Sequence, residues 1–258
     1  MNLRETTRDI INLVEERTGF PVEVMDDPTL KTAAVVSMAR RKTVPAHIIR
    51  YLPSPSQPPD YVICFECGYI LRLFDNPPGE RFEVSGVRGG LEQVEKMLFA
   101  QVRSLGLDKQ QLAPIAKQMY DGMLVHLRSI PIGLRIAAWL ADEYPELQDL
   151  QRIQVTKELK LNSETLNPEI RTMMPDIIYR ASAAVNGAFA LFWSHRYQKP
   201  SLTQPYVQAG YRKDAGDLME IWNQVPSDPS HDRELIDQWG EALGLRTWYQ
   251  WVPYQAPS

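Results

Sequence analysis

The sequence is poor in cysteine and has little excess charge of either sign. Cys64 and Cys67 are the only cysteines among its 258 residues. Two cysteines are too few for a disulfide framework and are typical of a reducing compartment. The formal net charge is −4, so the chain has no general electrostatic attraction for phosphate backbones or anionic lipids. These shortages disfavour a small secreted scaffold, and we expect no nucleic-acid partner.

Long apolar segments are also missing from the sequence. No stretch approaches the roughly 20 apolar residues that a membrane span needs. Residues 1–19 are charged and amphipathic, without the apolar core or small-residue cleavage site of a secretory signal. Phosphate-binding loops, dinucleotide-binding glycine motifs and the G-x-S-x-G nucleophile motif do not occur. The sequence therefore predicts a cytoplasmic protein with no membrane partner.

The remaining composition is that of an ordinary globular chain, with 44% hydrophobic residues to form a core. Apolar residues at helical spacing predict a helix over 3–18, which ends at Gly19-Phe20-Pro21. Two β-branched runs at 33–39 and 46–52, joined by a basic turn, predict a small sheet. The proline-rich segment 53–60 follows as a connection and leads into an apolar helix over 61–74.

Helical patterns dominate from residue 87 onward, and prolines interrupt them. The sequence predicts an α+β protein in three parts: a small α+β region over 1–85, a helical region over 86–199 and an aromatic-rich segment over 200–258. The segment TWYQWVPY at the end of the last part predicts a strand. The predicted helices are 88–105, 109–128, 132–143, 147–161, 168–194, 214–223 and 231–243.

The segment ICFECGYILRLF at 63–74 places one glutamate inside an apolar run. Zinc peptidases of the H-E-x-x-H class need two histidines four residues apart, because these lie on one helix face and bind one zinc ion. The adjacent glutamate acts as the base toward the metal-bound water. Phe65, Glu66 and Tyr69 stand at the corresponding positions here. The simpler alternative is a chance glutamate on a core helix.

The order of elements around this segment resembles the ImmA/IrrE-type zincin-like metallopeptidases. A strand with a histidine, PAHIIRYLP at 45–53, precedes a proline-rich connection and the helix DYVICFECGYILRLF at 60–74. In that family an edge strand lies beside the helix that carries HExxH, and a later helix supplies a third ligand. The resemblance covers 45–75 and implies a degenerate relative. In such a relative Glu66 is a vestigial general base, and Glu143 is an acidic candidate for the third position.

The chemistry of the replaced positions limits what this resemblance implies. Phenylalanine has no lone pair for a metal, and tyrosine, with a pKa of about 10, binds zinc poorly compared with neutral imidazole. We therefore expect no metal and no cofactor at Phe65 and Tyr69. On a helical wheel both side chains share a face with Glu66, while Cys64 and Cys67 lie roughly opposite.

Glu66 is expected to be partly buried, because the helix is apolar nearly all round. A buried carboxylate must be hydrogen-bonded, paired or protonated. Its predicted partner is the hydroxyl of Tyr69, the side chain of Arg72, or His47 on the neighbouring strand. His47 itself either lines a groove or faces solvent.

Other chemistry-bearing residues have simpler interpretations. The C-x-x-C pair has no second pair to complete a zinc site and is interpreted as two buried thiols. His126 and His195 stand alone and are interpreted as structural or surface residues. The glycine-rich segment 86–90 either begins a helix or offers its backbone amides to an anion. The clustered C-terminal aromatics predict either a protein interface or the core of a terminal subdomain; they are Trp239, Trp248, Tyr249, Trp251 and Tyr254.

These observations predict a catalytically silent metallopeptidase-like protein that binds a protein or peptide partner, or serves as a subunit of a complex. Its binding cleft is expected between the strand at 46–52 and the helix at 61–74, where extended chain would add to a strand edge. Two alternatives stay open. One is an active metal-dependent hydrolase that binds zinc through Glu66, His47 and a later acidic residue, and the other is a helical scaffold without a cleft. The expected cleft residues are His47, Phe65, Glu66, Tyr69 and Arg72.

Overall fold

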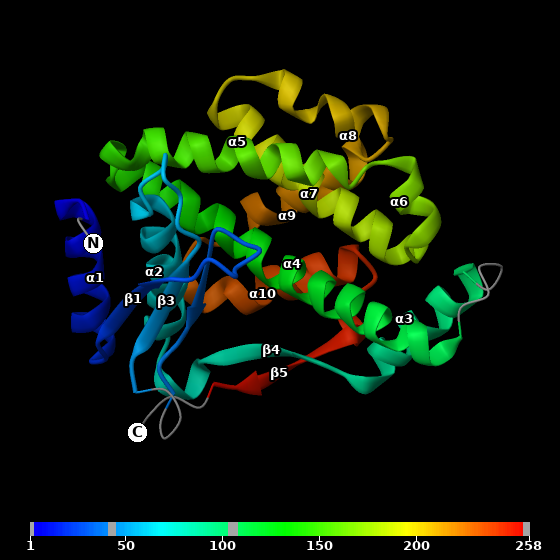
Figure 1. The fold of residues 1–258 in the computed structure, drawn as a ribbon, viewed down its shortest axis with the longest axis horizontal. Helices are drawn as coiled ribbons and strands as arrows, with labels where there is room; N and C mark the ends of the chain where they lie inside the picture. The colour runs from blue at the N-terminus through cyan, green and yellow to red at the C-terminus, as the bar shows by residue number, and fades with distance from the viewer. Residues whose placement is uncertain (1–2, 41–44, 103–107, 255–258) are drawn as a thin grey trace. The chain divides into compact units, whose positions relative to one another are not determined.

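The computed structural model describes residues 3–40, 45–102 and 108–254 (Figure 1). Most of these residues are helical, and the strands form two small sheets. The α+β fold class predicted from the sequence is confirmed, and the predicted boundaries after residues 85 and 199 stay predictions. The chain divides into two compact units, the first made of Met1–Glu83, Arg135–Val155 and Pro253–Ser258, the second of Val84–Leu134 and Thr156–Val252.

The first unit begins with helix α1, Glu5–Thr18. Thr7, Ile10 and Val14 form its buried stripe, at the i, i+3, i+4 spacing of an amphipathic helix. Gly19 ends the helix in the left-handed conformation, with φ of 75°, and its backbone N–H donates to the carbonyl of Glu15. Only glycine adopts this conformation without steric cost. The helix predicted over 3–18 is therefore confirmed, together with its stop signal.

A three-stranded sheet follows, with β3 between its two neighbours in the order β1-β3-β2. The strands predicted at 33–39 and 46–52 are confirmed as β2 and β3, which pair antiparallel. β1 was not predicted from the sequence, and it pairs parallel to β3. The expectation that the strand at 46–52 lies at an edge is therefore wrong. Residues 41–44 of the predicted turn lie outside the described residues. The strands span Val22–Asp26 (β1), Ala34–Ser37 (β2) and His47–Tyr51 (β3).

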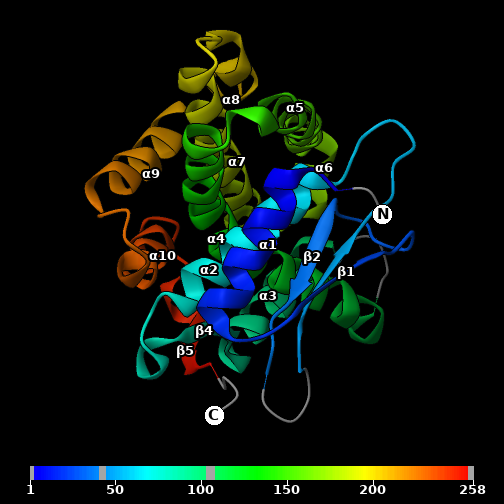
Figure 2. The ribbon, with the colours of Figure 1, turned by 90° about the vertical axis from the view of Figure 1, so that its left-hand side faces the viewer.

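Helix α2, Asp60–Phe74, confirms the helix predicted over 61–74. It lies beside α1 and against β2 and β3, as Figures 1 and 2 show from two sides. Gly68 permits a close approach to α4: a Cβ on Gly68 would lie 2.4 Å from Cγ2 of Ile136. The side that carries Gly68 is therefore tightly packed within the first unit.

Helix α4, Lys109–Glu143, is continuous, although two helices separated at Pro131 were predicted. A proline inside a helix removes one hydrogen bond and costs about 3 kcal/mol. Leu127, Ile132 and Leu134 are buried around it, so apolar packing stabilises the helix on both sides of the missing N–H. The indole N–H of Trp222 donates to the carbonyl of Pro131 at 3.1 Å. Tertiary contacts therefore outweigh the local signal for a break.

Within the described part of the chain, α4 alone is long and apolar enough to cross a membrane by length and composition. Of the residues in its most apolar stretch, 61% are buried inside the protein. Buried core helices satisfy the same criterion, so one such helix is weak evidence for a membrane span.

The second unit is built mainly of helices around α7, Asp176–Arg196, whose inner face includes the fully buried Trp193. The single helix predicted over 168–194 is interrupted, because Met174, the residue before Pro175, is extended.

The predicted terminal strand is confirmed as β5, which pairs with β4. The other helices and strands are α3 (Arg88–Val102), α5 (Gln148–Glu164), α6 (Pro168–Met173), α8 (Gln204–Gln208), α9 (Arg212–Gln224), α10 (Asp232–Ala242), β4 (Phe82–Gly86) and β5 (Tyr249–Pro253).

Candidate functional site

The two faces of α2 differ in burial as the helical wheel predicts. Cys64, Cys67 and Leu71 on one face are buried. Residues on the face that carries Glu66 are half-buried, which confirms the partial burial expected for Glu66. These residues are Val62, Phe65, Glu66, Tyr69 and Leu73.

Aromatic rings occupy the positions at which an H-E-x-x-H helix carries its histidines. The rings of Phe65 and Tyr69 meet edge to face, with 5.4 Å between their centroids. Tyr61, one turn earlier, extends the row, with its ring centroid 5.9 Å from that of Phe65. The amide N–H of Gln151 donates to the hydroxyl of Tyr61 at 3.4 Å. This face of the helix is therefore a ladder of packed rings.

His47 lies in the core, so neither a groove-lining nor a solvent-facing position is correct for it. Its side chain is fully buried on the central strand. The backbone N–H of Ala39 donates to Nδ1 at 3.1 Å. The neutral ring therefore carries its proton on Nε2, which donates to Oγ1 of Thr18 at 3.2 Å. Burial lowers the pKa of His47 to about 4.

The hydrogen bonds of His47 remove it from the predicted site. Both ring nitrogens have partners, so no lone pair is left for a metal, and the ring is not the partner of Glu66. The rings of Phe20 and Phe74 pack edge-on against the imidazole, at 5.8 and 5.0 Å between centroids. The histidine thus joins α1 and the sheet as a structural group.

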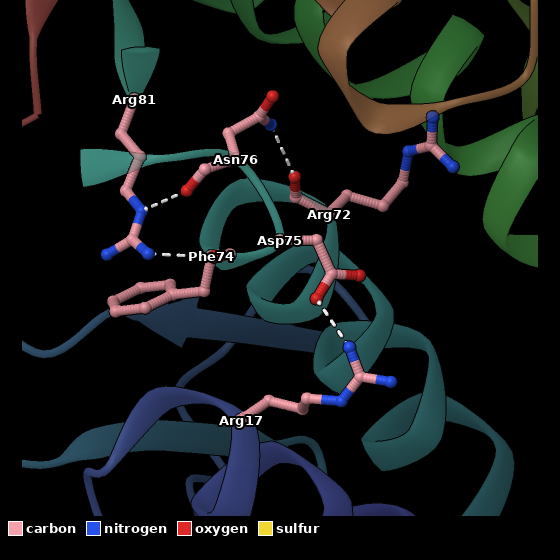
Figure 3. Close-up of polar contacts among 6 residues, drawn as sticks. All are labelled: Arg17, Arg72, Phe74, Asp75, Asn76 and Arg81. Atoms are coloured by element: carbon pink, nitrogen blue, oxygen red, sulfur yellow. Dashed lines mark hydrogen bonds and ion pairs between the residues drawn. The ribbon is translucent and has the colours of Figure 1, made fainter. Parts of the chain in front are cut away.

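Arg81 and Asn76 complete the C-terminal end of α2 (Figure 3). The guanidinium of Arg81 donates from Nη2 to the carbonyl of Phe74 and from Nε to that of Asn76, both at 2.8 Å. The Asn76 amide donates to the carbonyl of Arg72 at 2.9 Å. The last carbonyls of a helix lack intrahelical donors, so these side chains supply them.

The acidic and basic groups at this end of α2 also bear on the predicted cleft. Asp75 pairs with Arg17 of α1, with 3.4 Å between the closest atoms. Arg72 is half-buried, and its pairing with Glu66 stays a prediction, as does the pairing of Tyr69 with Glu66.

Sequence reasoning missed Arg81, because a cap supplied from seven residues beyond the helix has no fixed spacing.

β1 presents the backbone edge that the sequence assigned to the strand at 46–52. Pro21 accepts a hydrogen bond from His47, and the N–H of Asp27 donates to Tyr51. The backbone groups of alternate residues point to opposite sides of a strand, so those of Val22, Val24 and Asp26 point away from β3. The carboxylate of Glu15 accepts the N–H of Val22 at 2.8 Å.

In the described part of the chain, the carboxylate of Glu15 covers the outer side of β1 at its start. Among the described residues, β3 is the sole strand partner of β1. Glu15 covers the first outward amide, and the outward backbone groups of Val24 and Asp26 lie beyond it. An edge of this kind can receive an extended polypeptide by strand addition.

The two cysteines are buried free thiols, as predicted. Burial raises the pKa of Cys64 to about 12 and raises the pKa of Cys67 well above its ordinary value. Both lie inside α2, away from its N-terminus, where the helix dipole would favour a thiolate. This environment disfavours redox or nucleophilic chemistry.

The glycines at 86 and 90 serve close packing in the second unit. A Cβ on Gly86 would lie 2.7 Å from the hydroxyl oxygen of Tyr120, and one on Gly90 would lie 3.0 Å from Cα of Trp248. The hydroxyl of Tyr120 donates to the carbonyl of Val87 at 2.9 Å. These contacts explain the glycines by packing at the start of α3.

Most of the C-terminal aromatics are core residues. Trp239, Trp248, Tyr249 and Tyr254 are buried, and Trp251 is half-buried. Asp237 accepts hydrogen bonds from the Tyr249 hydroxyl at 2.8 Å and from the Trp251 indole at 2.9 Å. Of the two interpretations of this segment, burial favours core positions, which lie in the second unit for Trp239, Trp248 and Tyr249 and in the first unit for Tyr254.

The remaining candidates are scattered. Glu143 is exposed at the last residue of α4, and His195 is exposed at the end of α7. His126 is half-buried, and burial lowers its pKa. Nδ1 of His231 lies 3.0 Å from the carboxylate of Glu234.

A zinc ion does not fit at Phe65 and Tyr69, because Phe65 offers no lone pair and Tyr69 packs against it. Elsewhere in the described ranges, no three His, Cys, Asp or Glu side chains are grouped closely enough to hold a metal ion. Comparisons with protein-family models, curated proteins and solved structures gave no match.

Proposed function

We propose that this chain is a catalytically silent, metallopeptidase-like protein that binds an extended polypeptide segment of a partner. One observation carries the proposal: Phe65 and Tyr69 pack ring to ring on a helix that follows a histidine-bearing strand and a proline-rich connection. Two packed rings replace two metal ligands, while Glu66 keeps the position of the general base. In this proposal residues 65–69 have lost the capacity to bind a catalytic metal, while the helix that carries them stays folded.

The receiving element in this proposal is the outer edge of β1. β3 has a strand on both sides, so the edge originally expected at 46–52 is not accessible. The outward backbone groups of Val24 and Asp26 are the donors and acceptors that strand addition uses. Main-chain hydrogen bonds would supply affinity there, and side chains flanking the edge would supply selectivity.

Metal content and peptidase activity test the catalytically silent character. The purified chain is expected to contain no stoichiometric zinc and to cleave no peptide substrate. Stoichiometric zinc that Glu66→Ala abolishes would overturn this half of the proposal. A second variant, Phe65→His with Tyr69→His, restores both imidazoles at i and i+4, and we expect it to bind zinc as the resemblance implies.

Backbone substitution on β1 tests the binding edge. Asp26→Pro removes one outward N–H from an exposed position, whereas Asp26→Ala removes only the carboxylate. Partners that cross-link to each chain are captured and quantified. The captured amount should fall at least tenfold for Asp26→Pro and should be unchanged for Asp26→Ala. Equal recovery by both variants, or no recovery by the parent chain, would contradict the proposed edge.

A further inference from the structure

Tyr254 is a single buried anchor on the last described stretch of the chain. Its side chain is 4% exposed, whereas Pro253 before it is exposed and Val252 is half-buried. Tyr254 belongs to the first unit. Residues 156–252, which precede its segment in the sequence, belong to the second unit. The segment therefore reaches this site from a distant part of the sequence.

Three separate segments of the first unit hold the tyrosine. Its hydroxyl donates to the carbonyl of Ala39, just after β2. Its backbone N–H donates to the carbonyl of Arg81 at 2.8 Å. Its ring meets that of Phe74 edge-on, with 5.8 Å between centroids. The hydroxyl and the backbone N–H of Tyr254 therefore each donate to a backbone carbonyl.

A cation completes the site. The guanidinium of Arg40 lies over the tyrosine ring, 5.2 Å from its centroid, and also pairs with Glu83. The negative face of an aromatic ring attracts a cation placed over it, and the side chain of Arg40 is half-exposed. The hydroxyl contact distinguishes tyrosine from phenylalanine, since phenylalanine would leave the carbonyl of Ala39 without this donor.

We propose that this site is a pocket for a tyrosine on an extended polypeptide, and that the C-terminal segment of the chain is its intramolecular occupant. A main-chain hydrogen bond combined with one buried side chain is the pattern by which domains recognise extended peptides. The external ligand is then a partner segment that presents tyrosine in the same way. Release of the C-terminal segment would open the pocket to that partner.

This inference goes beyond the proposed function, because the pocket uses none of the residues of the β1 edge. A tethered occupant acts at an effective concentration of about 1 mM. A free peptide with a dissociation constant of about 50 µM would therefore appear roughly 20-fold weaker in the intact chain than in one with an emptied pocket.

A fluorescent peptide of residues 249–258, YQWVPYQAPS, is the probe for this pocket. We expect the Tyr254→Ala full-length chain to bind it at least tenfold more tightly than the parent chain, by fluorescence anisotropy. The same peptide with alanine in place of its second tyrosine should not bind. Equal affinity for the two chains, or equal binding of the two peptides, would overturn the proposal.

Two further variants separate the pocket from other effects. Arg40→Gln, added to Tyr254→Ala, should weaken peptide binding, whereas Arg50→Gln, which breaks a comparable ion pair with Asp27 in the same unit, should not. Asp26→Pro should leave peptide affinity unchanged. The same loss from Arg40→Gln and Arg50→Gln would contradict the assigned walls of the pocket.

Should Tyr254→Ala fail to fold by circular dichroism, the parent chain itself provides the test. The backbone N–H of Tyr254, which donates to Arg81, exchanges with deuterated solvent only after the segment leaves its pocket. Saturating tyrosine peptide should accelerate that exchange at least tenfold, and the alanine peptide should not. An exchange rate that the tyrosine peptide does not change would overturn the proposal.

Discussion

The hydroxyl of Thr7 donates a hydrogen bond of 2.7 Å to the carboxylate of Asp60, which joins α1 to the first residue of α2. The same oxygen accepts the backbone N–H of Arg4 at 2.8 Å. Asp60 is 1% exposed and Thr7 is fully buried. A buried carboxylate requires such donors, so this contact fixes how the first turn of α1 meets α2.

Replacing Thr7 with valine should lower the free energy of unfolding by about 1–3 kcal/mol, because it leaves a buried carboxylate with one donor fewer. Urea unfolding at pH 7 measures the loss. Thr6→Val is the matched control, since the hydroxyl of Thr6 donates to Glu146 in an exposed contact, and its loss should stay below about 1 kcal/mol. Similar losses for both variants would show that Asp60 does not depend on Thr7.

The buried imidazole of His47 should make stability fall in mild acid. Burial lowers the pKa of His47 from 6.5 to about 4, so the unfolded chain binds a proton at a higher pH than the folded chain does. The stabilising effect is present above pH 6.5 and is lost progressively as the pH falls to about 4. The loss for this one group is about 3 kcal/mol.

The His47→Gln variant isolates this contribution. Burial also lowers the pKa of His126. On acidification the free energy of unfolding of the parent chain should therefore fall by more than His47 alone accounts for. The difference between parent and variant, measured by urea unfolding at pH 7, 5.5 and 4.5, should shrink as the pH falls. A difference that stays constant over this range would contradict a neutral buried imidazole.

Gly68 should not tolerate a methyl group. The added Cβ would lie 2.4 Å from Cγ2 of Ile136, which is 1% exposed, so Gly68→Ala should cost about 1–3 kcal/mol through overpacking. Gly122→Ala is the control, because nothing lies within 4 Å of its added Cβ, and it should stabilise α4 by about 0.5–1 kcal/mol. Thermal unfolding distinguishes the two signs.

A double-mutant cycle tests the cause of the Gly68 effect. If the two side chains collide, Gly68→Ala combined with Ile136→Ala should cost less than the sum of the single variants. Strict additivity of the two costs would point to a different origin.

Cys64 and Cys67 should resist alkylation in the folded chain. Both are fully buried, and the raised pKa of Cys64, about 12, leaves roughly one thiol in ten thousand ionised at pH 8. Iodoacetamide labelling followed by mass spectrometry should therefore give no product in buffer and two labels in denaturant. Rapid labelling of the native chain would indicate an accessible thiol on α2.

Local sequence patterns were sufficient for the elements with strong periodicity. α1 has a clear apolar stripe and a glycine stop at Gly19, and the apolar run of α2 follows a proline-rich connection. β1 escaped prediction because its five residues include Glu23 and Asp26, and three of the five are exposed. The break expected at Pro131 failed because packing around the proline stabilises one continuous α4.

The sequence by itself determined the two faces of α2 and placed Phe65, Glu66 and Tyr69 on one of them, since helical geometry fixes which neighbours share a face. Only the tertiary structure decided that β3 is central, that His47 is a core residue and that Tyr254 is held by Ala39, 215 positions away. Strand order and the contacts of Tyr254 arise between segments that are distant in the sequence. No local periodicity encodes such contacts, because they depend on how the whole apolar surface is buried.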